Sequence, residues 1–409
     1  MKIALVRHMM DEPQGGARLA ALLARDLCEM GQDVTLYCYG YDQARCFPDL
    51  LADVPVRCVR RLDGAPGPPR GYETGWGRSW AQLRRYYHEA PVLASLIDAR
   101  TEIVNPHEWL AHRSAALFGL SRGVPIVWTY NDPSHWHVQS GWGLRELPYR
   151  ALGWFDTRQV NRFAAVTTLS RWMTQIGERA FTAPVQLVRC GIDARGIPAV
   201  PDRDHGPSTG ASVLRLLSVG ILAPWRRLED AIRAVAVARD AGCACHYEVI
   251  GSDRFWPSYG ILIRELVAEL GLGDAVSLRF ASVSEAELEA AYARADVAVF
   301  PNERQAWGLA QLEAMVRGVP LVASRGAGVS EVLSDGETAL LVDARRPDQI
   351  AHAILRLAAA VPLRKALAAR GRALVHESYT SVHYARRMLD VFRSSAAKRP
   401  PDRIVLGDV

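Results

Sequence analysis

The sequence predicts an α/β protein built from two doubly wound parallel-sheet domains, and three observations support this. The chain has 409 residues, and hydrophobic cores stop growing at roughly 250–300 residues, so two domains are expected. Short, continuously apolar runs recur along both halves with helix-length stretches between them, which is typical of buried parallel strands. A segment rich in Pro, Gly, Ser and Asp at 198–211 interrupts this alternation, which then restarts.

In the first half, a buried strand at 3–6 leads into a loop that holds Gly15 and Gly16. A helix follows, because leucines recur at helical spacing from Leu19 to Leu27. Gly31 ends this helix, and the next strand is expected at 34–37. Further strands are expected at 54–59, 103–104, 126–128, 166–167 and 185–188.

In the second half, strands are expected at 214–219, 247–250, 276–280, 297–300, 321–323 and 340–342. The predicted organisation is a first domain at 1–198, a linker at 199–212, a second domain at 213–378, a helix at 379–395 that returns to the first domain, and a disordered tail at 396–409. Ligands bind beyond the carboxyl ends of parallel strands. Two such sheets are therefore expected to face a cleft, one for a donor and one for an acceptor.

The composition excludes several classes of protein. The net charge is +5, but the only lysines are Lys2, Lys365 and Lys398, and none has the setting of a P-loop or of a pyridoxal site. Seven scattered cysteines form no paired CxxC motif, so neither a zinc site nor a disulfide framework is expected. We expect the protein to occupy a reducing compartment. No apolar run of ~18 residues exists, and the chain start does not resemble a signal peptide. A cytoplasmic protein is expected, with peripheral contact to the inner face of a membrane left open.

The most informative stretch runs from Phe300 to Met315, FPNERQAWGLAQLEAM. A strand ends at Phe300, a loop passes Gly308, and a helix begins near Leu309. Backbone amides and the positive end of a helix dipole attract an anion. A carboxylate at Glu313 can accept two hydrogen bonds from a ribose diol. Together these features predict a site for a nucleotide diphosphate.

This stretch closely resembles the signature of glycosyltransferase family 4, in which a glutamate, seven residues and a second glutamate precede Ala-Met and a Gly-x-Pro strand. The resemblance continues at 11–16, 188–193, 295–301, 326–332 and 335–336. It implies the GT-B fold of two Rossmann-like domains. It also implies a retaining, metal-independent transferase that moves a sugar from a nucleotide sugar, GDP-mannose or a UDP-sugar, to a glycan, lipid-linked or small-molecule acceptor. The nucleotide sugar is then a co-substrate, and no cofactor is expected.

The resemblance also implies roles for particular residues. Glu313 would hold the ribose, and Gln305, Asn131 and His107 would face the reacting sugar. Groups expected to bind the donor phosphates are Arg226, Arg227, Gly15, Gly16, Trp307, Gly308 and Leu309. Groups expected beside the nucleoside are Gly251, Phe280 and Val283.

Departures from the family pattern fall within this set. Gln305 replaces the leading glutamate, and Ile221 replaces an arginine, while Arg226 stands where a phosphate-binding lysine is expected. Asn131 replaces a histidine, which a same-face reaction tolerates if the donor's own phosphate oxygen takes the acceptor proton. The stretch at 40–47 resembles a mannosyltransferase of lipid-linked oligosaccharides.

Several alternatives stay open. A nucleotide-sugar epimerase of the same fold, or a sugar-nucleotide-binding protein that has lost catalysis, would carry similar motifs. For His107, a functional role and an ordinary place in a loop are equally favoured. An arginine- and aromatic-rich stretch at 68–87 is equally an acceptor or membrane contact and an ordinary helix; no nucleic-acid-binding fold accompanies it. Asp202-Arg203-Asp204 lies in the linker, so it is not read as a metal motif, and a metal site at His135 and His137 is less expected than a polar loop.

Overall fold

A computed structural model describes residues 1–62, 85–131, 147–197, 213–281 and 283–397, with the backbone alone for 85, 86 and 147–152. The described chain divides into two compact units. The first unit takes the residues up to Asp193 and those from Ser381 onward, and the second takes Ala194–Thr380. The predicted linker at 199–212, the tail beyond Ala397, and the histidines at 135 and 137 lie outside the described residues.

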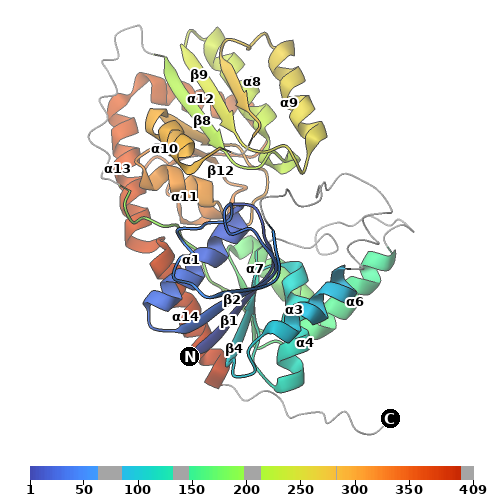
Figure 1. Ribbon diagram of the computed structural model, residues 1–409. Coiled ribbons are helices and arrows are strands. Elements are labelled where there is room, and N and C mark those ends of the chain that lie inside the picture. The colour runs from blue at the N-terminus through green and yellow to red at the C-terminus, as the bar shows by residue number, and fades with distance from the viewer. Residues whose placement is uncertain (63–84, 132–146, 198–212, 282, 398–409) are drawn as a thin grey trace. The chain divides into compact units, whose positions relative to one another are not determined.

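The first unit contains parallel strands in the orders β3-β2-β1-β4 and β5-β6-β7, and a bridge between Val104 and Ile126 joins the two groups. Its strands are β1 (Lys2–Met10), β2 (Asp33–Tyr41), β3 (Val56–Arg61), β4 (Ile103–Pro106), β5 (Val127–Tyr130), β6 (Ala165–Thr168) and β7 (Val185–Leu187). Its helices are α1 (Gly15–Glu29), η1 (Arg85–Glu89), α3 (Ala90–Leu96), α4 (Trp109–Arg122), α6 (Leu147–Val160), α7 (Arg171–Ala180) and α14 (Ser381–Ala397). Figure 1 shows these elements.

The continuous apolar character of β1 follows from its place in the sheet. It pairs with β2 at one edge and with β4 at the other, and α1 and α4 pack on it, so Ile3, Leu5 and their neighbours are buried alike. The strand expected at 54–59 begins later, at Val56, because Val54 closes a turn by donating its N–H to the Leu51 carbonyl at 3.2 Å.

The last helix, α14, belongs to the first unit although it follows the second in the chain. Tyr384, Met388 and Phe392 lie on one face of it and are buried, and the helix packs on α1. At its start the Ser381 N–H donates to the Ile192 carbonyl at 2.7 Å. The chain thus returns to the first unit beside the point where it left it. The helix continues to Ala397, two residues past the predicted end.

The second unit is a six-stranded parallel sheet in the order β10-β9-β8-β11-β12-β13. Its strands are β8 (Leu214–Val219), β9 (Cys245–Ile250), β10 (Val276–Arg279), β11 (Val297–Phe300), β12 (Leu321–Ser324) and β13 (Leu340–Val342). Its helices are η3 (Pro224–Arg226), α8 (Leu228–Asp240), α9 (Pro257–Glu269), α10 (Glu285–Arg294), α11 (Leu309–Val316), η4 (Gly328–Val332), α12 (Pro347–Ala359) and α13 (Val361–Ser378). The parallel α/β prediction is confirmed in both units.

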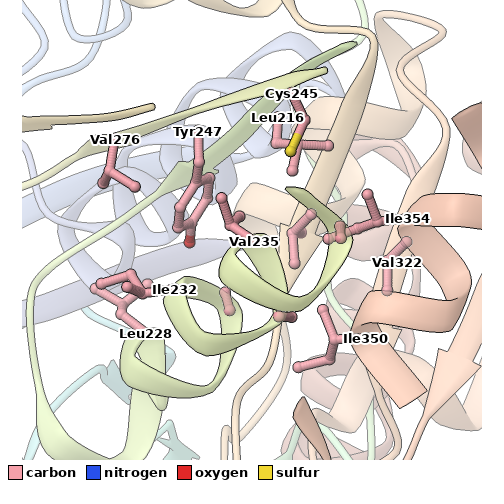
Figure 2. Packing of buried hydrophobic residues seen from close by; sticks show 14 of the residues in the cluster. Leu216, Leu228, Ile232, Val235, Cys245, Tyr247, Val276, Val322, Ile350 and Ile354 are labelled. Atoms are coloured by element: carbon pink, nitrogen blue, oxygen red, sulfur yellow. The ribbon is translucent and has the colours of Figure 1, made fainter. Parts of the chain in front are cut away.

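The core of the second unit lies between its sheet and the helices α8 and α12. Figure 2 shows Leu216, Tyr247 and Val322 of the strands together with Val235 of α8 and Ile354 of α12. At roughly 25 cal/mol per Å² of buried apolar surface, such side chains are the main source of stability of the unit. Within the described residues, no helix is both long enough and apolar enough to cross a membrane.

Candidate functional site

The carboxyl edge of the second sheet contains a point where the strand order reverses. The chain runs from β8 outward through β9 and β10, then returns to β11 and runs outward through β12 and β13. The loops after β8 and β11 therefore diverge, which leaves a crevice where ligands bind in open α/β sheets. Among the groups lining a small cavity of about 10 Å³ there are Gly220, Arg226, Phe300 and Asn302.

Two glycines allow the strand ends to approach each other at this point. Gly220 has a φ of 140°, and a Cβ there would meet the Arg226 guanidinium at 3.2 Å. A Cβ at Gly251, just after β9, would lie 1.7 Å from the Gly220 carbonyl oxygen. The guanidinium of Arg226 consequently lies flat against bare backbone at the reversal point.

The two neighbouring arginines have different surroundings. Arg226 ends η3 and lines the cavity. Arg227 takes a left-handed conformation (φ 54°), and its guanidinium donates twice to Asp230 at 2.9 Å and pairs with Glu229 at 2.8 Å. Because these carboxylates occupy the Arg227 side chain, Arg226 is the better-placed candidate for a phosphate.

The loop that carries Gln305 is bound to the loop that follows β12. The Gln305 N–H donates to the Gly326 carbonyl at 3.2 Å, and the Gly328 N–H donates back to the Gln305 carbonyl at 2.9 Å. The Val329 N–H donates to the Trp307 carbonyl at 3.1 Å. These hydrogen bonds hold the loop between β11 and α11 in one conformation.

The same loop is also joined to the segment that carries Arg226. The Glu303 N–H donates to the Trp225 carbonyl at 2.8 Å, one residue from Arg226. The Glu303 carboxylate itself pairs with Arg345 at 2.9 Å, and this ion pair lowers the pKa of Glu303. Glu303 is therefore turned toward Arg345.

The side chain of Gln305 belongs to a cluster of three amides. Its Oε1 accepts hydrogen bonds from Asn302 Nδ2 and from Gln311 Nε2, the latter at 2.8 Å. Asn302 and Gln311 are buried, whereas Gln305 is partly exposed. The sequence interpretation missed both partners. Asn302 had a signal, since it follows a strand end, and so had Gln311, a polar residue on the first turn of an apolar helix.

The first turns of α11 bring Gly308 and Glu313 to the same edge. Gly308 precedes the helix with a φ of 150°, and a Cβ there would lie 2.7 Å from Gln311 Oε1, so only glycine fits. Glu313 lies in the second turn, and the Tyr292 hydroxyl donates to its Oε2 at 3.4 Å. Leu309 begins the helix, as the sequence predicted.

The residues expected beside the nucleoside follow the two strands on the other side of the reversal point. Gly251 follows β9 and Phe280 follows β10, with the Arg264 guanidinium 4.5 Å from the Phe280 ring centre. Val283 lies just before α10. All three stand at the carboxyl edge of the sheet, and their contact with a nucleoside stays a prediction.

In the first unit, Gly15 and Gly16 form the start of α1 at the carboxyl edge of the sheet. A Cβ at Gly16 would lie 3.2 Å from Arg7 Nη1. Arg7 is buried and pairs with Glu108 at 3.6 Å. The glycine thus permits a close approach of helix backbone and guanidinium, and its role toward a phosphate stays a prediction.

His107 and Asn131 do lie together, at the ends of β4 and β5. Asn131 Nδ2 donates to the His107 carbonyl at 3.1 Å. The His107 ring is 1% exposed, and within the described residues neither ring nitrogen has a hydrogen-bond partner. Burial, with the charge of Arg7, lowers the pKa of His107 to about 3. The ring is therefore neutral near pH 7 and a weak proton acceptor, and its expected role facing a sugar remains a prediction.

Models of two protein families match the chain. The model described as Glycosyltransferase Family 4 matches residues 13–195, and the one described as Glycosyl transferases group 1 matches residues 212–374. A D-inositol 3-phosphate glycosyltransferase of a Nocardioides species is 34% identical over 73% of this chain and 68% of its own length. That of Salinispora tropica is 27% identical over 94% of this chain and 82% of its own length.

Solved structures are similar at the level of the fold. A crystal structure of HepE from Anabaena, in complex with UDP and glucose, has a TM-score of 0.74 and 16% sequence identity, over 96% of this chain and all of that one. At this identity the likeness concerns the arrangement of helices and strands alone.

Proposed function

The chain belongs to glycosyltransferase family 4, and on that premise we propose that it is a retaining, metal-independent enzyme that transfers a sugar from a nucleotide-diphosphate sugar to an acceptor hydroxyl. The observation that carries the proposal is the reversal point of the second sheet. There Arg226 lies on Gly220, beside the loop that leads through Gln305 to the start of α11.

This arrangement suits a diphosphate leaving group. Negative charge develops on the leaving phosphate in the transition state, and a fixed cation with preorganised amides stabilises it. Arg226 supplies the cation, and the N–H groups after Gly308 point along a helix dipole toward the same edge. An arginine can neutralise the phosphates as a metal ion would. Among the described residues, no three His, Cys, Asp or Glu side chains form a group that could hold a metal ion.

The proton of the acceptor hydroxyl needs a recipient. His107, with its lowered pKa, and Asn131, an amide, are both poor bases. This favours transfer of the proton to the oxygen of the departing phosphate, on the same face of the sugar, with retention of the anomeric configuration. We propose GDP-mannose or a UDP-sugar as donor, and a glycan, a lipid-linked sugar or a small molecule as acceptor. The stretch at 68–87, most of which lies outside the described residues, leaves peripheral contact with a membrane as a prediction.

Calorimetry of UDP and GDP binding in the presence of EDTA tests the donor site. We expect one nucleotide to bind with an affinity that added magnesium changes by less than about twofold, because Arg226 neutralises the phosphates. Arg226→Met is expected to weaken binding by more than tenfold. Loss of all binding on chelation, restored by magnesium, would contradict metal independence.

A pair of matched substitutions tests the position of the ribose. Glu313→Gln should weaken nucleotide binding roughly tenfold, because hydrogen bonds to a charged acceptor are about twice as strong as neutral ones. Glu303→Gln should change it little, because that carboxylate pairs with Arg345. Equal losses in the two variants would place the ribose elsewhere.

Product analysis then distinguishes transfer from the alternatives. A transferase gives a glycoside only when an acceptor is present, and nuclear magnetic resonance should show the anomeric configuration of the donor in the product. A new sugar nucleotide formed without acceptor would indicate an epimerase, and nucleotide binding with no product from any acceptor would indicate a binding protein.

A further inference from the structure

A groove of about 370 Å³ runs between α8 and α9 of the second unit. The two helices contact each other and lie side by side (Figure 1). One wall of the groove includes Arg233 of α8, and the other includes Leu262, Glu265 and Glu269 of α9. The groove is distinct from the cavity beside Arg226, because no described residue lines both.

The two walls of the groove carry charges of opposite sign. Arg233 is exposed on the α8 wall, and Glu265 and Glu269 are exposed on the α9 wall. In the part of the chain that the structure describes, the side chains of these three residues make neither a hydrogen bond nor an ion pair. Arg227 and Glu229, which also line the groove, do pair with each other at 2.8 Å. Arg233 and the two glutamates are therefore available to a binding partner.

Large apolar side chains are exposed beside these charges. Val237 follows Arg233 by about one helical turn and is 49% exposed. On α9, Ile261 and Leu262 are 52% and 47% exposed, and they precede Glu265 by about one turn. A surface helix ordinarily turns a polar face to water, and a contiguous exposed apolar patch marks a site of protein–protein contact. The surface of α8 and α9 therefore combines apolar side chains with charges of both signs.

Opposite charges on the two walls of one groove fit a second copy of the same surface. A polyanion or a polycation would be attracted by a groove of a single sign. In a twofold dimer both copies use the same surface, so each contact between two different residues occurs twice. Arg233 of each copy can then meet Glu265 of the other copy, while Ile261 and Leu262 of both copies are removed from water.

We propose that the protein forms a twofold symmetric homodimer through a dimer face made by Arg233, Val237, Ile261, Leu262 and Glu265. The apolar side chains supply the free energy of association, and the two charge contacts fix the register of the copies. The dimer face lies within the second unit, and its residues take no part in the proposed donor site. The inference goes beyond the proposed function, and neither depends on the other.

Sedimentation equilibrium of the full chain measures the mass in solution and the dissociation constant of the dimer. We expect the wild-type protein to reach twice the mass of one chain at submillimolar concentration. Arg233→Glu and Glu265→Arg each set like charges against each other at both contacts, so each should weaken the dimer roughly tenfold or more. The control is Arg370→Glu, at an exposed position of α13, which packs on α11. It should leave the dissociation constant unchanged.

An equimolar mixture of the two single variants gives the sharpest test. Arg233→Glu leaves one copy with glutamate at both positions, and Glu265→Arg leaves the other copy with arginine at both. Opposite charges therefore meet again at both contacts of a mixed dimer. The mixture should associate about as strongly as the wild-type protein and more strongly than either variant alone. The variant that carries both substitutions should likewise associate with itself.

Three outcomes would overturn the inference. A wild-type protein that stays monomeric at submillimolar concentration would leave the groove to a partner of another kind. A dimer that neither single variant weakens would show that the copies meet through another surface. Loss of the dimer in the single variants without recovery in the mixture would show that the two charges act within one chain. Nucleotide binding is measured separately, so each of these outcomes leaves the proposed function standing.

Discussion

Two adjacent arginines at the carboxyl edge of the second sheet, Arg226 and Arg227, have different neighbours. Arg227 is occupied by Glu229 and Asp230, whereas Arg226 lies against the backbone of Gly220 at the cavity. The motif alone cannot separate these two adjacent guanidinium groups. The distinction comes from the left-handed backbone of Arg227, which turns its side chain onto the first turn of α8.

The burial of His107 leads to a pH-dependent stability. Its pKa of about 3 in the folded protein lies below the ordinary value of 6.5, so the unfolded chain binds a proton between these values and the folded protein does not. The free energy of unfolding is therefore highest above pH 6.5 and falls as the pH falls toward 3. At pH 5 the loss should be roughly 2 kcal/mol, at 1.36 kcal/mol per pH unit.

Denaturant unfolding at pH 7.5 and pH 5 measures this effect. His107→Gln cannot titrate, so its stability should fall less between the two values than that of the wild-type protein. His88→Gln, at an exposed position, should keep the wild-type difference. If His107→Gln and the wild type lost the same free energy, the ring would not be held neutral by burial.

At the scale of elements, the site depends on two loops that run side by side. The loop from β11 to α11 and the loop after β12 exchange backbone hydrogen bonds around Gln305. A Cβ at Gly326 would lie 2.1 Å from the Glu303 carbonyl oxygen, so the close approach of the loops needs a glycine there. Backbone atoms cannot move aside as a flexible side chain can.

Gly326→Ala should therefore separate the two loops. We expect it to destabilise the second unit by roughly 1–3 kcal/mol, the usual cost of overpacking, and to weaken nucleotide binding. Gly273→Ala is the matched control, because a Cβ there would meet nothing within 4 Å; its effect should stay within about 0.5 kcal/mol. Thermal unfolding and calorimetry measure both effects, and a Gly326→Ala protein equal to this control would mean that the loops do not need the close contact.

At the scale of the whole molecule, the two units do not follow one another simply along the chain, because the last helix belongs to the first unit. The first unit is completed only by α14, the last helix described, whose buried face includes Tyr384 and Phe392. The residues proposed for the donor site between Gly220 and Glu313 belong to the second unit, whereas Gly15 and Gly16 belong to the first. Stability of the first unit and nucleotide binding by the second should therefore respond to different substitutions.

Phe392→Ala tests this division. The side chain is fully buried, so its removal should destabilise the first unit by roughly 3–5 kcal/mol. Nucleotide affinity should change less than about twofold at a temperature where the protein is folded. Arg393→Ala, at the adjacent exposed side chain, should alter neither quantity. A large loss of nucleotide affinity in Phe392→Ala would show that the donor site depends on the first unit.

The sequence by itself determined the positions of most strands and the sugar-transferring family. A run such as Val297–Phe300 is apolar at every position, which only a strand covered on both faces requires. The loop at Gly308 and the start of the helix after it could be predicted, because glycines in loops and helix starts are recognisable from the local sequence. Arg226 was proposed as a phosphate-binding residue because it stands where the resembled family has a lysine.

The tertiary structure alone decided which polar groups meet. The burial of His107 depends on elements distant in sequence, and so does the contact of Gly326 with Glu303. The contact between the side chains of Gln305 and Gln311 depends on Gln311 facing inward from a helix whose other buried residues are apolar. Hydrophobic periodicity encodes which face of an element is buried, but not which donor finds which acceptor, because a hydrogen bond depends on positions that only packing brings together.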